Sequence, residues 1–212
     1  MTEADLREQI VDVMRQMEAR GLNRGTSGNV SVRFGDGLLV TPSGVPAGAL
    51  TPRSIVYVDA DGEAAAGPRP SSEWRMHAGL YARRPDFSAV VHCHSRHATI
   101  LACAGKPIPP LHYMIAVSGR SDVPLAPYRL FGSLELAQAV AEAMDGGRAC
   151  LMANHGLITA AEGLAHALAI AEEIEEQAAV YCGCLAIGGP NLLSEARMAE
   201  VMARFSTYGQ TR

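Results

Sequence analysis

The sequence has one lysine, few aromatic residues and no long apolar run. Lys106 stands between Gly105 and Pro107 in a predicted turn, which argues against catalysis through a lysine Schiff base. No uncharged apolar stretch approaches the roughly 20 residues that a membrane-spanning helix needs. Acidic residues and arginines are interspersed through residues 1–20, so we expect no signal peptide.

Concentrated charge of either sign is also missing. The formal net charge is −4, and no long run of like charges occurs, which argues against binding to nucleic acid or to a membrane surface. Five cysteines form an odd set without the spacing of a zinc finger, and we interpret them as reduced core thiols of a cytoplasmic protein. They are Cys93, Cys103, Cys150, Cys182 and Cys184.

The length and the hydrophobic pattern indicate the fold class. A chain of 212 residues can bury a sizeable core, and we expect one domain over 1–212 or one subunit of an oligomer. Apolar residues at helical spacing predict helices over 2–21, 73–84, 96–104, 134–144, 161–187 and 195–205. Short apolar runs between turns predict strands over 30–34, 38–41, 54–59, 88–94, 112–117, 122–126 and 149–153. This pattern indicates an α/β domain with a central, mostly antiparallel mixed sheet covered by helices.

Two histidines, one residue apart, end the predicted strand 88–94. Side chains alternate between the two faces of a strand, so His92 and His94 point the same way, roughly 6–7 Å apart along the strand. Two imidazoles can then converge on one metal ion. A lone histidine on an apolar face is usually a packed core residue, but this pair at a strand end favours a metal site.

Two other residues are candidates for the remaining ligands. His155 comes just after the predicted strand 149–153, and Glu73 comes directly after two serines. Three histidines and one carboxylate would fill a tetrahedral site that a substrate can open. On sequence alone, however, a carboxylate in the first turn of a helix is explained as well by the helix dipole. The remaining histidines are expected to be structural, with His77 packing against its own helix or that helix's neighbours; they are His77, His97, His112 and His166.

Three small turns combine glycine or serine with exposed backbone N–H groups, at 26–29, 43–44 and 71–72. The third opens a helix, where the dipole and the unpaired N–H groups favour an anion. If the three turns converge in space, they would cradle a phosphate, although most turns of this composition are only turns. The glycine patterns of nucleotide-binding loops are absent from the sequence, so nucleotide binding is disfavoured.

Five motifs in this order resemble the class II aldolase/adducin family, and within it the branch that cleaves ketose 1-phosphates. The resemblance covers almost the whole chain. The motifs are Gly25-Thr26-Ser27-Gly28-Asn29-Val30-Ser31, Thr41-Pro42-Ser43-Gly44, Ser71-Ser72-Glu73, His92-Cys93-His94 and Asn154-His155-Gly156.

The resemblance implies roles for these residues. His92, His94 and His155 would bind Zn²⁺, with Mn²⁺ or Co²⁺ as alternatives, and Glu73 would be a resting ligand that leaves the metal to act as acid/base. A second acid/base, Tyr113, would come from a neighbouring subunit, so the resemblance also implies a homotetramer with active sites at subunit interfaces. The implied phosphate site is Thr26, Gly28, Asn29, Ser43, Gly44, Ser71 and Ser72. The implied aldehyde pocket is Phe131, Phe205 and Tyr208.

The activity implied by the resemblance is a cytoplasmic, metal-dependent aldolase. Such an enzyme reversibly cleaves a ketose 1-phosphate to dihydroxyacetone phosphate and an aldehyde. Candidate substrates are L-fuculose 1-phosphate and the 1-phosphates of 5-deoxyribulose and 5-methylthioribulose.

Three other activities remain open. An L-ribulose-5-phosphate 4-epimerase would use the same metal but release no aldehyde, and Tyr113 favours the aldolase because the epimerases have an aspartate in the matching segment. A decarboxylase of an acidic sugar phosphate would release carbon dioxide. An adducin-like binding module would catalyse nothing, and would be favoured if the purified protein held no metal.

Overall fold

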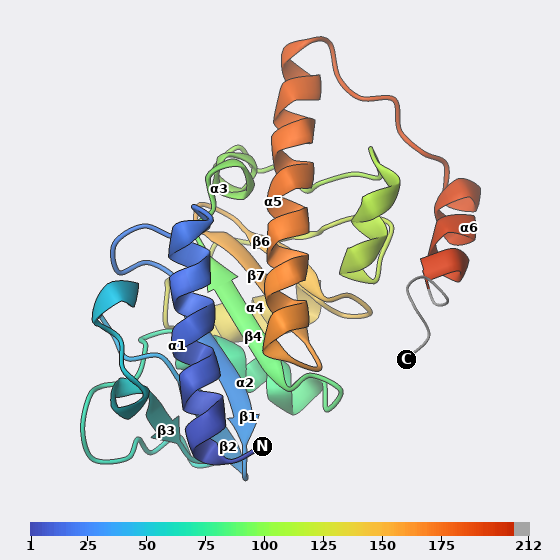
Figure 1. Cartoon of the computed structure of the whole chain (residues 1–212). Helices are drawn as coiled ribbons and strands as arrows, with labels where there is room; N and C mark the ends of the chain where they lie inside the picture. The colour runs from blue at the N-terminus through green and yellow to red at the C-terminus, as the bar shows by residue number, and fades with distance from the viewer. Residues whose placement is uncertain (206–212) are drawn as a thin grey trace.

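A single mixed sheet runs through the protein, whose computed structural model describes residues 1–205 (Figure 1). Seven strands of this described part form the sheet, in the order β3-β2-β1-β4-β7-β6-β5. All neighbours pair antiparallel except β5 and β6, which are parallel. The strands are β1 (Asn29–Phe34), β2 (Gly37–Val40), β3 (Val56–Val58), β4 (Ala89–Cys93), β5 (Leu125–Ala126), β6 (Ala149–Met152) and β7 (Gly156–Ala161). The predicted α/β fold with a mostly antiparallel mixed sheet is confirmed.

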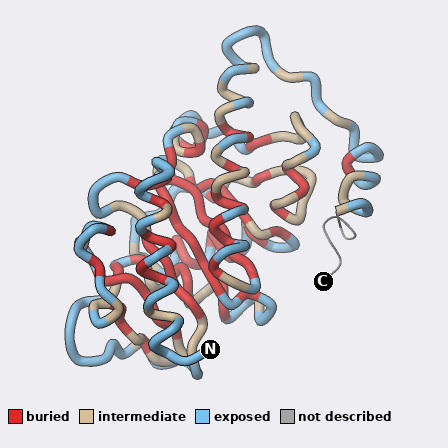
Figure 2. The backbone as a smooth tube through the Cα atoms, in the orientation of Figure 1, coloured by how far each residue is buried: buried red, intermediate tan, exposed pale blue. Residues whose placement is uncertain are grey.

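Helices cover both faces of this sheet. One core lies between the sheet and α1 (Glu3–Ala19), α3 (Arg96–Cys103) and α5 (Leu164–Ala186). A second core lies on the other face, under α2 (Trp74–Arg83) and α4 (Leu134–Ala143). Figure 2 shows the strands as the buried centre and the outer sides of the helices as exposed. Among residues 1–205, no helix is both long and apolar enough to cross a membrane.

The alternation of side chains along two central strands directs polar residues to the α2 face. In β4, Val91 belongs to the core under α1 and α5, whereas Val90 belongs to the core under α2 and α4, so His92 points toward α2. In β1, Val30 faces the first core, so Asn29 and Ser31 on either side of it point toward α2 as well. Because β1 and β4 are paired, with Asn29 opposite His92, these polar side chains share one region of the sheet.

The hairpin of β6 and β7 differs from the prediction. The segment 156–161, which had no predicted strand, is β7, and the following helix begins at Leu164 rather than near 161. Asn154 has a φ of 56°, a left-handed conformation that asparagine tolerates better than most residues, and it turns the chain tightly between the two strands. The sequence predicted no strand here because the short apolar segment 156–161 is followed almost directly by the long apolar helix α5 (Leu164–Ala186), and the two segments look like one helix.

The predicted strand over 112–117 is wrong. Tyr113–Ser118 forms the 3₁₀ helix η3, which packs against α5 and against α6 (Glu195–Phe205) instead of joining the sheet. Its apolar residues fill the space between these helices, so tertiary packing overrides the strand-like composition. The next predicted strand, 122–126, is reduced to the two residues of β5.

The cysteine prediction holds only in part. All five thiols are free, but only Cys93 and Cys150 are buried in the core. Cys103 is exposed, and Cys182 and Cys184 are half-buried on α5. The two buried cysteines lie on inner strands of the sheet. Cys93 on β4 faces the core under α1, α3 and α5, and Cys150 on β6 faces the core under α2 and α4.

Candidate active site

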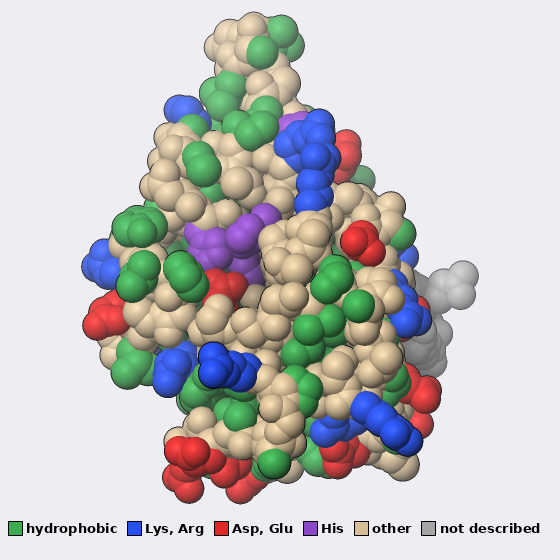
Figure 3. All heavy atoms as spheres, turned by 90° about the vertical axis from the view of Figure 1, so that its left-hand side faces the viewer, with side chains coloured by type: hydrophobic (Ala, Val, Ile, Leu, Met, Phe, Trp, Pro, Cys, Tyr) green, Lys and Arg blue, Asp and Glu red, His purple; other side chains and the backbone are tan. Residues whose placement is uncertain are grey.

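Three histidines from neighbouring strands meet at one place on the surface. His92 is in β4 and His94 directly follows it, whereas His155 lies in the tight turn between β6 and β7. Their ring centroids are 4.8–4.9 Å apart, and the Nε2 atoms of His92 and His94 are 3.1 Å apart. One potential ligand atom from each ring lies within 4.8 Å of the others. Figure 3 shows the histidine cluster in a hollow of the surface, with an acidic side chain beside it.

A backbone hydrogen bond fixes the orientation of the His92 ring. Its Nδ1 atom lies 2.9 Å from the carbonyl oxygen of Leu157 on the paired strand β7. A carbonyl oxygen only accepts, so Nδ1 carries the hydrogen and donates it. The Nε2 atom of neutral His92 therefore has its lone pair free, and that atom points at the other two rings, as a metal ligand requires.

Glu73 lies on the remaining side of the histidine cluster. Its Oε2 atom is 3.2 Å from His92 Nε2, and its Oε1 atom is 3.1 Å from His155 Nε2. Glu73 is the N-cap residue of α2, yet its side chain makes no capping hydrogen bond. The carboxylate is therefore directed at the imidazoles and not at the backbone of its own helix. Among the described residues, no well-aligned donor satisfies the buried Oε1 atom.

The protonation states of Glu73 and His94 suit metal binding. Burial alone would lower the pKa of His92, but the adjacent Glu73 carboxylate raises it above its usual value. Burial alone would raise the pKa of the Glu73 carboxyl, but the imidazoles of His92 and His155 hold it well below its usual range. Partial burial of the ring, together with the neighbouring His92 and His155, lowers the pKa of His94 to about 4. Near pH 7, Glu73 is ionised and His94 is neutral. A carboxylate and three imidazole lone pairs are a donor set that fits Zn²⁺ and similar divalent ions.

Two residues that the sequence analysis did not single out for a role hold this cluster together. Gly156 begins β7 so close to β4 that a Cβ atom there would lie 2.5 Å from the Cys93 carbonyl oxygen and 3.0 Å from His94 Cδ2. Asn23, buried after α1, accepts a hydrogen bond from the backbone N–H of His94 through its Oδ1 atom, at 3.2 Å. The role of Gly156 had a signal in the sequence, since a glycine directly follows the predicted ligand His155. Nothing in the sequence near Asn23 points to His94.

The three predicted turns do converge. Ser71 donates its backbone N–H to the Thr41 carbonyl oxygen at 2.9 Å, and Ser43 donates to the Arg69 carbonyl oxygen at 2.9 Å. These bonds place turn 43–44 beside turn 71–72. Val30 directly follows the first turn, and Thr41 precedes the second by two residues. The backbone N–H of Thr41 donates to the carbonyl oxygen of Val30 at 3.1 Å, which brings these two turns close together. Of the predicted phosphate residues in these turns, Thr26, Ser43, Gly44 and Ser72 are exposed, and Asn29 and Ser71 are buried.

A small cleft of about 500 Å³ adjoins these turns. Ser43 and Ser72 line it together with Phe131, one of the predicted aldehyde-pocket residues, and with Arg69 and Arg75. The loop that carries Phe131 approaches the second turn very closely, because a Cβ atom at Gly132 would lie 2.7 Å from the Ser72 carbonyl oxygen. The structure thus brings one aromatic candidate to the phosphate candidates within a single chain.

The other predicted residues lie elsewhere. Tyr113 opens η3, is 51% exposed and contacts the His112 ring at 4.7 Å between centroids. In Figure 1, η3 lies to the right of α5, whereas the histidine cluster is on the face at the left, which Figure 3 shows. Phe205 ends α6 and packs against the core under α1, α3 and α5. Tyr208 lies outside the described residues.

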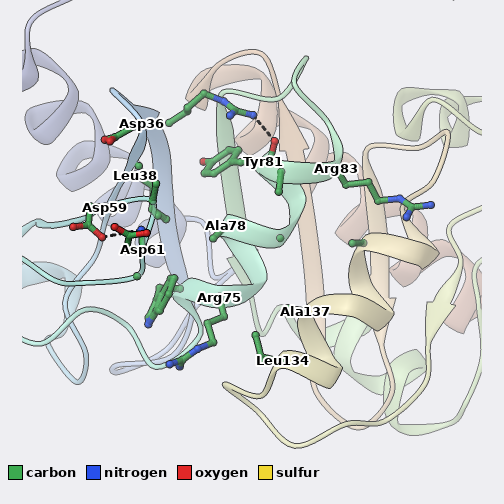
Figure 4. A pocket seen from close by; sticks show the side chains of 18 of the residues that line it. Asp36, Leu38, Asp59, Asp61, Arg75, Ala78, Tyr81, Arg83, Leu134 and Ala137 are labelled. Atoms are coloured by element: carbon green, nitrogen blue, oxygen red, sulfur yellow. Dashed lines mark hydrogen bonds between the residues drawn. The ribbon is translucent and has the colours of Figure 1, made fainter.

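A larger cleft, of about 1050 Å³, lies between the β1–β2 hairpin and α2 and α4, and none of the predicted site residues lines it (Figure 4). The labelled Asp59 and Asp61 stand on the strand side of this cleft, and Arg75 and Arg83 stand on the helix side. The predicted site is therefore nearer the smaller cleft, because Ser43, Ser72 and Phe131 line that cleft and Ser72 directly precedes Glu73.

Comparison with known proteins identifies the family. Residues 8–182 match the model of the Class II Aldolase and Adducin N-terminal domain. A 5-methylthioribulose-1-phosphate/5-deoxyribulose-1-phosphate aldolase of Rhodospirillum rubrum is 47% identical over 96% of this chain and 92% of its own length. An L-fuculose phosphate aldolase of Escherichia coli K12 is 45% identical over 96% of this chain and 95% of its own. A solved L-fuculose 1-phosphate aldolase superposes with a TM-score of 0.93 at 37% identity, covering 97% of this chain and 98% of that one. The resemblance seen in the five motifs is thereby confirmed, and this chain belongs to the class II aldolase and adducin family.

Proposed function

We propose that the protein is a metal-dependent aldolase that reversibly cleaves a ketose 1-phosphate into dihydroxyacetone phosphate and an aldehyde. The observation that carries this proposal is the meeting of three imidazoles and the Glu73 carboxylate beside the three small turns. The names of the relatives in Rhodospirillum rubrum and Escherichia coli support the same reaction class.

His92, His94, His155 and Glu73 are assigned to hold one divalent ion, most simply Zn²⁺, with Mn²⁺ or Co²⁺ as alternatives. When bound, the ion would act as a Lewis acid toward the ketose oxygens and lower the energy of the negative charge that develops there. The chain then needs groups that bind the phosphate and groups that move protons at C3 and at the C4 hydroxyl.

The turns are assigned to the phosphate. Ser71 and Ser72 precede α2, and the helix dipole favours an anion at this N-terminus. Arg69 and Arg75 line the same cleft and add positive charge. The proposed phosphate residues are Thr26, Gly28, Asn29, Ser43, Gly44, Ser71 and Ser72.

Glu73 is assigned the proton at C3. It lies one residue beyond the proposed phosphate serines, and its carboxylate is ionised and so able to accept a proton. A positioned carboxylate that leaves its resting contact with the imidazoles can take the C3 proton and return it. In the direction of cleavage, Glu73 must first take up a proton, which balances the proton that the C4 hydroxyl loses, and its transfer to C3 then completes dihydroxyacetone phosphate.

Tyr113 is assigned the proton of the C4 hydroxyl, and it would act in the site of a neighbouring subunit. The family resemblance implies this role, and the exposure of Tyr113 on η3, away from the histidine cluster in the views of Figures 1 and 3, supports it. A residue that serves another copy requires an assembly, which we propose to be a cyclic homotetramer with its active sites at the subunit interfaces. Phe205 and Tyr208 remain proposed contributors to the aldehyde pocket.

The apolar Phe131 beside Ser72 suits an aldehyde without a terminal hydroxyl group. L-Fuculose 1-phosphate and the 1-phosphates of 5-deoxyribulose and 5-methylthioribulose all end in a methyl or methylthio group, so all three are proposed substrates. All five cysteines are free thiols, which suits our proposal that the enzyme works in the cytoplasm.

The test is a panel of ketose 1-phosphates with coupled detection of dihydroxyacetone phosphate, ranked by kcat/KM, with analysis of the aldehyde and the metal content. We expect dihydroxyacetone phosphate and one equivalent of aldehyde from at least one of the three substrates. Interconversion of pentulose 5-phosphates without aldehyde would support an epimerase instead. Release of carbon dioxide from an acidic sugar phosphate would support a decarboxylase, and a metal-free, inactive protein would support a binding module.

A further inference from the structure

A buried chain of hydrogen bonds runs from the Glu73 carboxylate into the core under α2. Asn29 Nδ2 lies 2.8 Å from Glu73 Oε2, and Asn29 Oδ1 lies 2.6 Å from His77 Nε2. On the other side of the imidazole, His77 Nδ1 lies 2.7 Å from Ser31 Oγ, which is 2.7 Å from the Tyr81 hydroxyl. His77 and Ser31 are completely buried, and the other three are at most 7% exposed. The chain thus connects β1 and α2 through buried side chains.

The chemistry of these groups gives every bond one direction. An ionised carboxylate only accepts, so the amide group of Asn29 that faces Glu73 is its NH₂, and its oxygen faces His77. The His77 nitrogen that faces this oxygen, Nε2, must carry a hydrogen. Burial lowers the pKa of His77 to about 3, so the ring is neutral and Nδ1 accepts from the Ser31 hydroxyl. Ser31 then has a lone pair left to accept from Tyr81.

We propose that His77 is a positioning residue for Glu73: its Nε2–H holds the Asn29 amide in the one orientation that presents the NH₂ group to the carboxylate. The inference rests on the proposed role of Glu73 as a ligand and acid/base. A reversed amide would direct its oxygen at the carboxylate oxygen, and the repulsion would push Glu73 away from its place between His92 and His155. The tautomer of a buried histidine thereby determines where Glu73 rests.

The far end of the chain is itself anchored. Arg33 donates to the Tyr81 carbonyl oxygen at 2.7 Å, and its guanidinium carbon lies 5.0 Å from the centre of the Tyr81 ring. Figure 4 shows Tyr81 on α2 at the wall of the larger cleft, with this hydrogen bond drawn. Since His77 supplies one partner to Asn29 and one to Ser31, a purely apolar residue at position 77 would leave the Asn29 oxygen and the Ser31 hydroxyl each short of one partner.

The experiment compares three substitutions at one position, in metal-loaded, full-length protein. The side-chain nitrogen of glutamine coincides with Nε2 of histidine, so His77→Gln keeps the donor to Asn29 and loses the contact with Ser31. The side chain of asparagine ends near Nδ1, so His77→Asn keeps the Ser31 side and loses the donor. His77→Leu loses both. The readouts are metal affinity by chelator competition and exchange of the C3 hydrogen of dihydroxyacetone phosphate with solvent, with the thermal midpoint recorded for each variant.

We expect His77→Leu and His77→Asn to weaken metal affinity by roughly 10–100-fold, the usual effect of losing a group behind a metal ligand, and to slow C3 exchange by a similar factor. His77→Gln should stay within about threefold of wild type in both. Thr159→Val is the matched control, because Thr159 is a fully buried hydroxyl that donates to the Ala167 carbonyl oxygen outside this chain of bonds. It should lower the thermal midpoint and leave metal affinity unchanged.

A double substitution distinguishes positioning from simple packing. If His77 acts through Glu73, His77→Leu added to Glu73→Gln should weaken metal affinity no further than Glu73→Gln alone. Equal metal affinity in the Leu, Asn and Gln variants, or full additivity with Glu73→Gln, would overturn the inference. Metal affinity needs no substrate, so the inference can fail while the wild type cleaves ketose phosphates. It can also survive when the wild type cleaves none of them.

Discussion

The histidine cluster and η3 differ in almost every physical respect. In the cluster, His92 is completely buried, a backbone carbonyl fixes its ring, and Glu73 is directed at two of the imidazoles. On η3, Tyr113 is half exposed, and its ring contacts that of the adjacent His112. One region is already built by a single chain, whereas the other presents its reactive group outward.

This difference indicates which parts of catalysis one chain can provide. Preorganised ligands cost little to arrange when an ion or a substrate arrives, and the sheet supplies that order through β4, β7 and the turn between β6 and β7. An exposed tyrosine gains a fixed position only when another surface covers it. We therefore expect changes in the cluster to abolish metal-dependent steps, and changes on η3 to affect a step that depends on the assembly.

The largest effect should come from breaking the cluster directly. His94→Ala removes one of three imidazoles, and we expect metal content and turnover to fall below about 1% of wild type. Metal analysis of the purified protein measures the first, and the coupled assay measures the second. His166→Ala is the matched control, because His166 lies on the surface of α5, pairs with Glu162 and should keep full metal content. Undiminished metal in His94→Ala would refute the assignment.

Glu73→Gln tests whether the carboxylate does more than complete the cluster. If it only complemented the α2 dipole, the change would cost about 0.3–1 kcal/mol of stability and leave turnover almost unchanged. If it moves the C3 proton, turnover and C3 exchange should both fall by roughly 10²–10⁴-fold in a folded protein. Wild-type exchange rates in Glu73→Gln would remove the residue from the mechanism.

Tyr113→Phe should sharpen the comparison, since it leaves the cluster intact. We expect cleavage to slow by roughly 10²–10³-fold, because the C4 hydroxyl loses its base. Exchange at C3 needs no aldehyde and should continue at the wild-type rate. A parallel loss of exchange would mean that Tyr113 acts on the same proton as Glu73, and the division of roles between the two regions would be wrong.

The smallest effect concerns the pH dependence of stability. The pKa of His77 is about 3 in the folded protein and about 6.5 in the unfolded chain, so the unfolded state binds the proton first as pH falls. Between these values, His77 should lower the free energy of unfolding by up to about 1.4 kcal/mol for each pH unit of acidification. His77→Gln lacks this titration, so its free energy of unfolding should rise relative to that of wild type as the pH falls below about 6.5. Denaturant unfolding at fixed metal concentration measures this difference. A difference in the free energy of unfolding that stays constant with pH would contradict the lowered pKa of His77.

The sequence predicted those features that depend on local patterns. The period-2 alternation of a strand placed His92 and His94 on one side, and the turn residues marked the three loops that the structure brings together. It also predicted the mixed, mostly antiparallel sheet, because short strands with tight turns pair antiparallel.

The remaining features depend on contacts distant in the sequence. η3 has the composition of a strand, but α5 and α6 leave it no sheet edge to join. The partners of His77 lie on β1, 46 and 48 residues away in the chain, so helical spacing alone suggested a packing role. The polar Asn29 and Ser31 alternate on β1 with the buried Val30 and Val32, and this alternation was the signal that could have revealed the chain of bonds.

One measurement tests most directly whether the two regions belong to different subunits of one active site. Glu73→Gln and Tyr113→Phe chains, each nearly inactive alone, are co-expressed at equal levels and purified as mixed assemblies. If each site combines Glu73 of one subunit with Tyr113 of the next, random mixing restores both residues in about a quarter of the sites, and cleavage should recover to that level. If both residues of a site come from the same chain, no intact site forms, and mixed assemblies as inactive as the two parents would contradict the account.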